Sequence, residues 1–258
     1  MDDAPEFDRL LAEGGAAPVD GWDFSWFAGR ATEQRPSWGY ARTVLPPRVA
    51  AAGRLLDMQT GGGEVLAEVL TRAGQRPALV AATEGWPPNV AVAGRHLRPL
   101  AASLVEVADD ACLPFASGSF DLVTGRHPTR IRWPEIARVL RRGGTYLAQH
   151  VAAGSVQELT NFLMGPQPVG RSRDPEHVAA QAEAAGLHVV DLRSEALRTE
   201  FYDIAAVVAF LRKVVWIVPG FTVADYRDRL AALHEHIRTE GAFVAFARRF
   251  LIEAYRPE

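Results

Sequence analysis

The chain has 258 residues and a formal net charge of -3 at pH 7, a length that suits one large domain or a core domain with a cap. Its 48% hydrophobic and 23% charged residues are typical of globular proteins, and no apolar run has the length of a membrane span. The single cysteine, Cys112, excludes an intrachain disulfide and a multi-cysteine metal site, so we expect no metal. Residues 1–6 are acidic, unlike a signal peptide, and we expect a cytoplasmic protein without membrane partners.

Residues 1–50 are predicted to form a lid segment ahead of the core domain, residues 51–258. This segment contains aromatic side chains interleaved with Arg30 and Arg35. The aromatic residues are Trp22, Phe24, Trp26, Phe27, Trp38 and Tyr40. Aromatic residues in such a stretch either pack onto the core or belong to a lid that closes over a ligand and excludes water. Under the second interpretation, the candidate substrate contacts are Trp26, Trp38 and Tyr40.

An apolar run at residues 54–58, which contains Asp57, is followed by a glycine-rich break and an amphipathic segment at 64–70. This pattern predicts a buried strand, a tight turn and a helix. We call the break, residues 59–63, the glycine turn. Glycines permit positive φ angles and a close approach of a ligand, and the helix start offers N–H groups to polar or anionic atoms. Taken alone, the pattern fits either a nucleotide site or a turn that binds nothing.

Strands and helices then alternate along the chain. Strands are predicted at 77–83, 103–107, 120–124 and 145–151, and helices at 89–100 and 134–140. The alternation predicts a parallel sheet that is covered on both faces and has right-handed crossovers. Ligands bind such sheets beyond the carboxyl ends of the strands. Glu84, residues 109–110 and residues 126–127 occupy these positions, and Glu84 stands about twenty residues after the glycine turn, as a ribose-binding carboxylate does.

The later chain is predicted to contain a helix at 175–185, a strand at 187–192, helices at 204–215 and 223–239, and a closing strand at 241–255. The first part of the 200–240 insertion is strongly apolar. It is either a helix packed into the core or a cap whose inner face lines an apolar pocket. For the second interpretation, Tyr202 and Trp216 are candidate substrate contacts.

Five motifs stand in order along the middle of the chain. They are residues 56–63, Glu84, residues 109–115, residues 119–123 and residues 135–144. Together they resemble the class I S-adenosylmethionine-dependent methyltransferases over about residues 54–150, and a nicotinamide-binding Rossmann domain lacks the 109–123 pattern. The resemblance implies an α/β, Rossmann-like, doubly wound sheet of about seven strands, mostly parallel with an antiparallel last strand. The helical N-terminal lid and the helical cap insertion at about 200–240 are added to this core.

The resemblance also implies a cofactor, S-adenosyl-L-methionine. The glycine turn and Asp57 would contact its methionine part, and Glu84 would bind its ribose. Trp86 would stack on adenine, whose edge would be bound by Asp110 and Ala111. The complete implied set of cofactor-binding residues is Asp57, Gln59, Thr60, Gly61, Gly63, Glu84, Gly85, Trp86, Asp109, Asp110, Ala111 and Arg126.

One position departs from the family pattern. The family usually has a glycine two residues after the acidic residue of the first motif, where this chain has Gln59. Its side chain either crowds the carboxylate end of the cofactor or forms a hydrogen bond to it. The chain is accordingly either an accommodated enzyme variant or a degenerate protein that binds the cofactor weakly or not at all.

Methyl transfer from a sulfonium is an in-line displacement in which positioning supplies much of the acceleration, and a hydroxyl acceptor benefits from a general base. His127, after the fourth predicted strand, is the predicted catalytic base, and its alternative role is to shape the turn beside Pro128. His150 is the second choice and a candidate substrate contact. Arg126 and His127 would face the methyl group.

The acceptor is predicted to be a small organic molecule. The insertion also resembles that of guanine-N1 ribosomal RNA methyltransferases, but the cysteine zinc module of that group is absent. Together with the net charge of -3, this absence makes nucleic acid the minority prediction. The alternatives are an rRNA or tRNA methyltransferase and a non-catalytic S-adenosylmethionine-binding protein. We expect a monomer or a homodimer.

Overall fold

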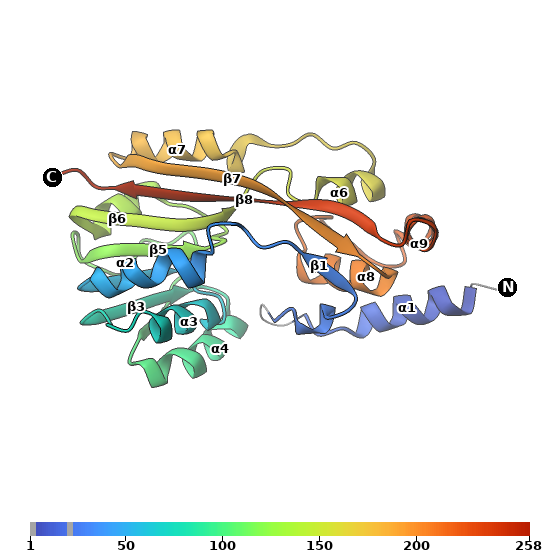
Figure 1. Ribbon diagram of the computed structural model, residues 1–258, viewed down its shortest axis with the longest axis horizontal. Coiled ribbons are helices and arrows are strands. Elements are labelled where there is room, and N and C mark those ends of the chain that lie inside the picture. The colour runs from blue at the N-terminus through green and yellow to red at the C-terminus, as the bar shows by residue number, and fades with distance from the viewer. Residues whose placement is uncertain (1–3, 20–22) are drawn as a thin grey trace. The chain divides into compact units, whose positions relative to one another are not determined.

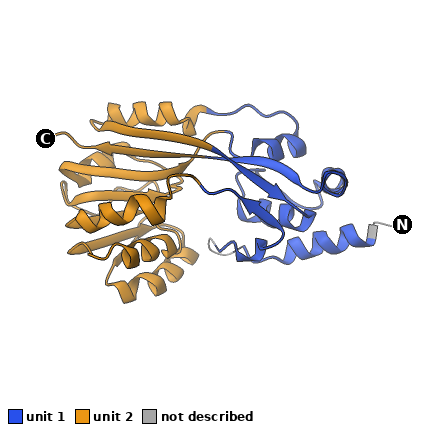
Figure 2. Ribbon diagram, viewed as in Figure 1, with its two compact units in different colours: residues 1–35, 154–170, 196–248 blue, residues 36–153, 171–195, 249–258 orange. Residues whose placement is uncertain are grey.

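The computed structural model describes residues 4–19 and 23–258, so Trp22 of the aromatic stretch lies outside the described residues. The chain divides into two compact units (Figure 2). Unit 1 comprises Met1–Arg35, Gly154–Gly170 and Ala196–Arg248, and unit 2 comprises Pro36–Ala153, Arg171–Glu195 and Arg249–Glu258. Residues 36–50 of the predicted lid segment therefore group with unit 2. In the described part of the chain, no helix has both the length and the apolar character needed to cross a membrane.

The sheet is eight-stranded (Figure 1). Its strands are β1 (Ala31–Glu33), β2 (Arg54–Met58), β3 (Leu79–Glu84), β4 (Ser103–Glu106), β5 (Phe120–Arg126), β6 (Leu140–Val151), β7 (His188–Phe201) and β8 (Phe243–Tyr255). Their order is β1-β7-β8-β6-β5-β2-β3-β4. Neighbours from β4 to β6 pair in parallel, whereas β8 is antiparallel to β6 and β1 is antiparallel to β7. The predicted, mostly parallel α/β sheet with an antiparallel last strand is confirmed, and the short strand β1 is an addition to it.

Helices cover both faces of the sheet in unit 2. They are α2 (Leu45–Ala51), α3 (Glu64–Arg72), α4 (Pro87–Leu97), α5 (Trp133–Val139) and α7 (Pro175–Ala184). Successive side chains of a strand point to opposite faces, so Leu55 packs with α2, α3 and α4, and Leu56 packs with α5 and α7. Both leucines are fully buried, and each contributes about 2 kcal/mol by its burial. The two packed layers fix the ends of the parallel strands, where the polar residues gather.

Unit 1 has its own hydrophobic core. Its helices are α1 (Ala4–Ala16), α6 (Gln157–Met164), α8 (Ile204–Lys213) and α9 (Arg227–Glu240). Asp203 caps α8 by accepting a hydrogen bond from the Ala206 N–H at 2.7 Å. Gly14 on α1 lies so close to α8 that a Cβ atom there would come within 2.5 Å of the Ala205 carbonyl oxygen. Because α8 is buried along almost its whole length within the unit 1 core, this apolar segment is a core helix of unit 1.

Candidate active site

The glycine turn connects β2 to α3 and is hydrogen-bonded to the end of the neighbouring strand β3. The Gln59 N–H donates to Thr83 Oγ1 at 3.2 Å, and the Thr60 N–H donates to the Thr83 carbonyl oxygen at 2.9 Å. The Gly61 N–H donates to Glu84 Oε2 at 2.7 Å. Gln59 and Gly61 have positive φ angles of 51° and 64°. The turn is therefore held against the end of β3 by three hydrogen bonds.

Gly63, the last glycine of the turn, is required by packing. Its φ angle is 78°, and a Cβ atom would lie 3.0 Å from Leu97 Cγ and 3.3 Å from Ala93 Cα on α4. Glycine avoids both the steric cost of positive φ and this contact. Gly85 is confined in the same way, because its Cβ atom would lie 2.7 Å from the Val107 carbonyl oxygen. These two glycines let α3 approach α4 and let the chain after β3 approach the chain after β4.

Asp57 lies at the end of β2 and is 8% exposed. Its carboxylate accepts hydrogen bonds from Thr60 Oγ1 at 2.7 Å and from Thr124 Oγ1 at 2.6 Å. Burial raises the pKa of Asp57, and the two hydroxyl hydrogen bonds oppose this rise. Asp57 thus joins the glycine turn to β5, and a contact of Asp57 with the cofactor remains a prediction.

Glu84 ends β3 and is 6% exposed. Its carboxylate accepts three backbone hydrogen bonds, from Gly61 at 2.7 Å, Gly85 at 3.1 Å and Trp86 at 2.9 Å. Burial raises its pKa, while these hydrogen bonds lower it. Because a carboxylate has about four acceptor positions, one position remains for a ligand hydroxyl. The Trp86 side chain beside it is 46% exposed.

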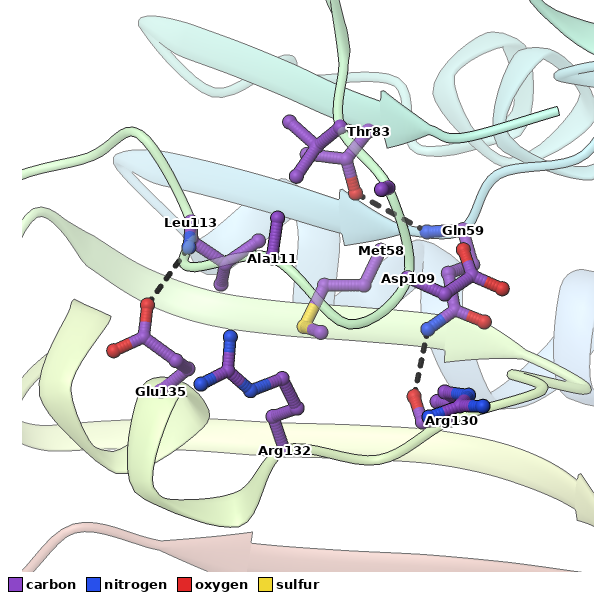
Figure 3. A pocket seen from close by; sticks show the side chains of 11 residues that line it. Met58, Gln59, Thr83, Asp109, Ala111, Leu113, Arg130, Arg132 and Glu135 are labelled. Atoms are coloured by element: carbon purple, nitrogen blue, oxygen red, sulfur yellow. Dashed lines mark hydrogen bonds between the residues drawn. The ribbon is translucent and has the colours of Figure 1, made fainter. Parts of the chain in front are cut away.

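A small pocket lies beyond the ends of β2 and β3 in unit 2 (Figure 3). It is lined by Met58, Gln59, Thr83, Val107, Ala108, Asp109, Ala111, Leu113, Arg130, Arg132 and Glu135. Asp109 therefore lines the pocket, whereas Asp110 is exposed and does not. The Ala111 N–H, which the resemblance assigns to the adenine ring, donates to the Ala108 carbonyl oxygen at 2.9 Å. The assignments of Asp110 and Ala111 to adenine remain predictions.

The Gln59 side chain extends from the glycine turn to the loop after β5 (Figure 3). Gln59 Nε2 donates to the Arg130 carbonyl oxygen at 2.7 Å, and Gln59 Oε1 accepts from Thr129 N at 2.7 Å and from Thr129 Oγ1 at 3.1 Å. The single hydroxyl proton of Thr129 is shared between Gln59 Oε1 and Asp109 Oδ2. A positive φ angle costs a non-glycine residue about 1 kcal/mol, and the two unshared hydrogen bonds of Gln59, to Thr129 N and the Arg130 carbonyl oxygen, offset this cost at about 1 kcal/mol each. Gln59 is therefore accommodated, and it connects two walls of the pocket.

Glu135 and Arg138 hold another wall of the pocket. The Glu135 carboxylate accepts from the Leu113 N–H at 2.7 Å and from Arg138 Nε and Nη2, each at 2.8 Å. Arg138 also donates to the carbonyl oxygens of Phe115 at 2.7 Å and Leu113 at 2.9 Å. The hydrogen bonds from Arg138 are the main reason why the pKa of Glu135 falls to about 2. This pair fixes residues 113–115 to α5.

His127 follows β5 and is bonded to Gln149 on β6. The backbone N–H of His127 donates to the backbone carbonyl oxygen of Gln149 at 2.7 Å. In the side chains, Gln149 Nε2 donates to His127 Nε2 at 2.8 Å. Gln149 Oε1 accepts from Trp38 Nε1 at 2.8 Å, which leaves the amide NH₂ group for the imidazole. Burial, followed by the charges of nearby arginines, holds the pKa of His127 well below its usual value. His127 is therefore a neutral imidazole with its proton on Nδ1.

The other predicted acceptor-side residues of unit 2 are buried. Trp38 and Tyr40 are each 5% exposed, and the Tyr40 hydroxyl donates to the Gly125 carbonyl oxygen at 2.8 Å. His150 Nε2 lies 3.0 Å from the Tyr146 hydroxyl, and its ring stacks on Phe250. Burial, with a smaller effect from a nearby arginine, lowers the pKa of His150 to about 3. These three residues support the ends of β5 and β6 from within the core.

The remaining predicted substrate contacts, Trp26, Tyr202 and Trp216, belong to unit 1. The Arg30 guanidinium lies 4.8 Å from the centre of the Trp26 ring. The Tyr202 hydroxyl lies 2.9 Å from Thr32 Oγ1, and the Trp216 side chain is 41% exposed. Their contact with a substrate remains a prediction.

Several residues that hold the site together were not predicted from the sequence. They are Thr83, Thr124, Thr129, Glu135 and Gln149. A signal existed for Thr124, because parallel pairing of two neighbouring strands places it opposite Asp57. Glu135 lies inside a family motif, but its partner Leu113 is 22 residues away. Thr129 and Gln149 carried no recognisable signal.

Residues 56–148 match the family model described as "Methyltransferase domain". No curated protein matches the chain. The fold is similar to that of the YcgJ protein from Bacillus subtilis, with 18% sequence identity and a TM-score of 0.57. It is also similar to that of a putative methyltransferase from Bacillus halodurans C-125, with 16% sequence identity and a TM-score of 0.58. Each of these two alignments covers 83% of this chain and 97% of the other chain. The [4+2]-cyclase SpnF is also similar, at 17% identity and a TM-score of 0.51, over 99% of this chain and 93% of SpnF. The family match and the shared fold identify residues 56–148 as a methyltransferase domain.

Proposed function

We propose that this protein transfers the methyl group of S-adenosylmethionine to a small organic acceptor. The observation that carries the proposal is the arrangement at the end of β3. There the Glu84 carboxylate accepts hydrogen bonds from Gly61, Gly85 and Trp86 and retains one acceptor position. The methyltransferase domain over residues 56–148 supports the same conclusion.

The residues around Glu84 fit this cofactor. The free acceptor position of Glu84 suits a ribose hydroxyl, and the exposed Trp86 ring suits the face of adenine. The Asp109 carboxylate, which lines the neighbouring pocket, suits the adenine amino group, and we assign this role to Asp109 in place of Asp110. When bound, S-adenosylmethionine supplies an electrophilic methyl group.

The carboxyl ends of β5 and β6 would orient the acceptor. His127 Nε2 accepts a hydrogen bond from Gln149, and Nδ1 carries the proton. A neutral amine acceptor needs only positioning before attack. For a hydroxyl acceptor, His127 Nε2 would take the proton after the Gln149 amide has moved away. His127 is therefore our proposed general base for hydroxyl acceptors.

The net charge of -3 supports a small acceptor over a polyanion. A direct measurement of chemistry tests the proposal, since a similar fold occurs in the [4+2]-cyclase SpnF. The test is to incubate the full chain with S-adenosylmethionine that carries a ¹³C-methyl group and a low-mass extract, and to search for labelled products by mass spectrometry. A parallel incubation contains total RNA.

Labelled small molecules are expected, and they should be absent with the Glu84→Gln variant. Label found only in RNA would replace the proposal with nucleic-acid methylation. Cofactor binding without a labelled product in either incubation would favour the non-catalytic alternative.

A further inference from the structure

Two arginines lie on one face of the sheet at the acceptor end of unit 2. Arg126 is the last residue of β5 and pairs with Gln149 of β6, and Arg249 of β8 pairs with Val151 of β6. Paired residues share a face, and residues two apart on a strand also share a face. Arg126 and Arg249 therefore lie on the face that also holds the Gln149 amide and His127.

A third arginine, Arg173, lies just beyond the end of β6. Its carbonyl oxygen accepts a hydrogen bond from the Ala153 N–H at 2.9 Å. The charge of Arg173 also contributes, after burial, to lowering the pKa of both His127 and His150. We call Arg126, Arg173 and Arg249 the arginine cluster.

Arg173 is incompletely satisfied in the described structure. Its side chain is partly buried, and burial lowers its pKa. Within residues 4–19 and 23–258, it forms no side-chain hydrogen bond or ion pair. Desolvation of a charged group is costly unless the group is paired. The planar guanidinium of arginine matches a carboxylate or a phosphate group through two parallel hydrogen bonds.

The arginine cluster stands at the ends of β5 and β6, whereas Glu84 and its pocket stand at the ends of β2 and β3. We propose that the arginine cluster binds a carboxylate or phosphate group of the methyl acceptor beside His127. The acceptors of this protein are then small anionic molecules. The identity of the anion as an acceptor rests on the proposed function, whereas binding of an anion at the cluster does not.

The test titrates benzoate and inorganic phosphate separately into the full chain by calorimetry, with and without saturating S-adenosylhomocysteine. Arg173→Gln should weaken the binding of the preferred anion by about tenfold, because one charge-assisted contact is lost. The matched control is Arg171→Gln, which changes an exposed arginine in the same short turn and should leave the affinity unchanged. Tighter binding of benzoate assigns a carboxylate, and tighter binding of phosphate assigns a phosphate.

Arg173→Lys keeps the charge and should retain part of the affinity, and thermal melting identifies any variant that fails to fold. Equal anion affinities of the wild type and a folded Arg173→Gln variant would overturn the proposal. The proposal would also be overturned if Arg173→Gln weakened the binding of S-adenosylhomocysteine as much as it weakened the binding of the anion, because the cluster would then bind the carboxylate of the cofactor. A third outcome would overturn the proposal: neither small anion binds, whereas a short RNA binds to the wild type and loses affinity in Arg173→Gln. A wild-type chain that binds the anions but not S-adenosylhomocysteine would refute the proposed function and leave the anion site intact.

Discussion

The two sides of the site in unit 2 are built from different chemistry. At the ends of β2 and β3, two buried carboxylates, Asp57 and Glu84, are satisfied by hydroxyl groups and backbone N–H groups. At the ends of β5 and β6, a neutral imidazole lies among arginines and is held by the amide of Gln149. Under the proposed function, the first side would offer acceptors to the hydroxyl and amino groups of a cofactor, whereas the second would offer donors and positive charge to an acceptor molecule.

The two sides of the site also differ in the contacts along the chain that assemble them. Glu84 accepts hydrogen bonds from residues at positions 61, 85 and 86, so the parallel pairing of β2 with the next strand in sequence, β3, assembles it. The acceptor side depends on Trp38 reaching Gln149 across a sequence separation of 111 residues. Substitutions on the first side should therefore change cofactor affinity, and substitutions on the second should change the pH dependence and the choice of acceptor.

The largest effect is expected from Glu84→Gln. The amide lacks the charge that three backbone N–H groups and a ribose hydroxyl require, and S-adenosylhomocysteine affinity should fall by about 100-fold. Glu106→Gln is the matched control, because Glu106 pairs with Glu84 on the adjacent strand β4 and is exposed. Calorimetric titration of both variants checks the prediction, and equal affinities in the two variants would contradict it.

Glu135→Gln should change the acid stability of the pocket wall. The folded-state pKa of Glu135 is about 2 against an ordinary value of 4.5, so its stabilising effect is complete above pH 4.5 and is lost as the pH falls toward 2. Between pH 5 and pH 3, the free energy of unfolding of the wild type should fall by about 2 kcal/mol more than that of the variant. Urea unfolding at both pH values measures this difference. Glu68→Gln, which removes an exposed pair with Arg42 and Arg72, serves as the control and should retain the wild-type pH dependence.

Gln149→Glu tests the acceptor side. A carboxylate next to His127 favours the imidazolium, so the pKa of His127 should rise by about one unit. If His127 is the base, the acidic limb of the rate profile moves to higher pH, because the imidazole must be neutral to take a proton. Gln181→Glu is a matched control, since Gln181 Nε2 lies 3.1 Å from Nε2 of a half-buried histidine, His177, on α7. A profile that does not move, while ¹⁵N NMR shows the pKa shift, would exclude His127 as the base.

The smallest effect is expected from Gln59→Gly. Glycine relieves the positive φ angle and removes the three hydrogen bonds to Thr129 and Arg130, so the loop after β5 is released from the glycine turn. The association rate constant of S-adenosylhomocysteine, measured by stopped flow, should become about threefold larger. This change corresponds to a fall of less than about 1 kcal/mol in the activation free energy of association. Thr129→Val should act in the same direction. Slower association in both variants would show that Gln59 binds the cofactor directly.

Much of the fold followed from the sequence because its signals are local. The strand–turn–helix at Asp57 and the position of Glu84 depend on short-range patterns, and the structure has these elements at the predicted places. Strand β7 was predicted to end at residue 192 but continues to Phe201. The apolar segment that forms α8 left core and cap interpretations open; it is buried within the core of unit 1, and a role of this unit as a cap stays a prediction.

The polar network of the site was less accessible to sequence reasoning. Gln59 stood out as a departure from the family pattern, but its partners Thr129 and Arg130 lie about 70 residues away. Likewise, the neutral state of His127 depends on Gln149 and on burial, which only the assembled sheet defines. Side-chain partners brought together by strand order leave no periodic signal in a single sequence.

The central claim is that the ends of β2 and β3 bind S-adenosylmethionine through Glu84. Calorimetric titration of the full chain with S-adenosylhomocysteine tests it most directly. The account predicts one saturable binding event per chain in the wild type and in Glu106→Gln, and a large loss of affinity in Glu84→Gln. Absence of binding heat at several temperatures, or undiminished binding by Glu84→Gln, would contradict it.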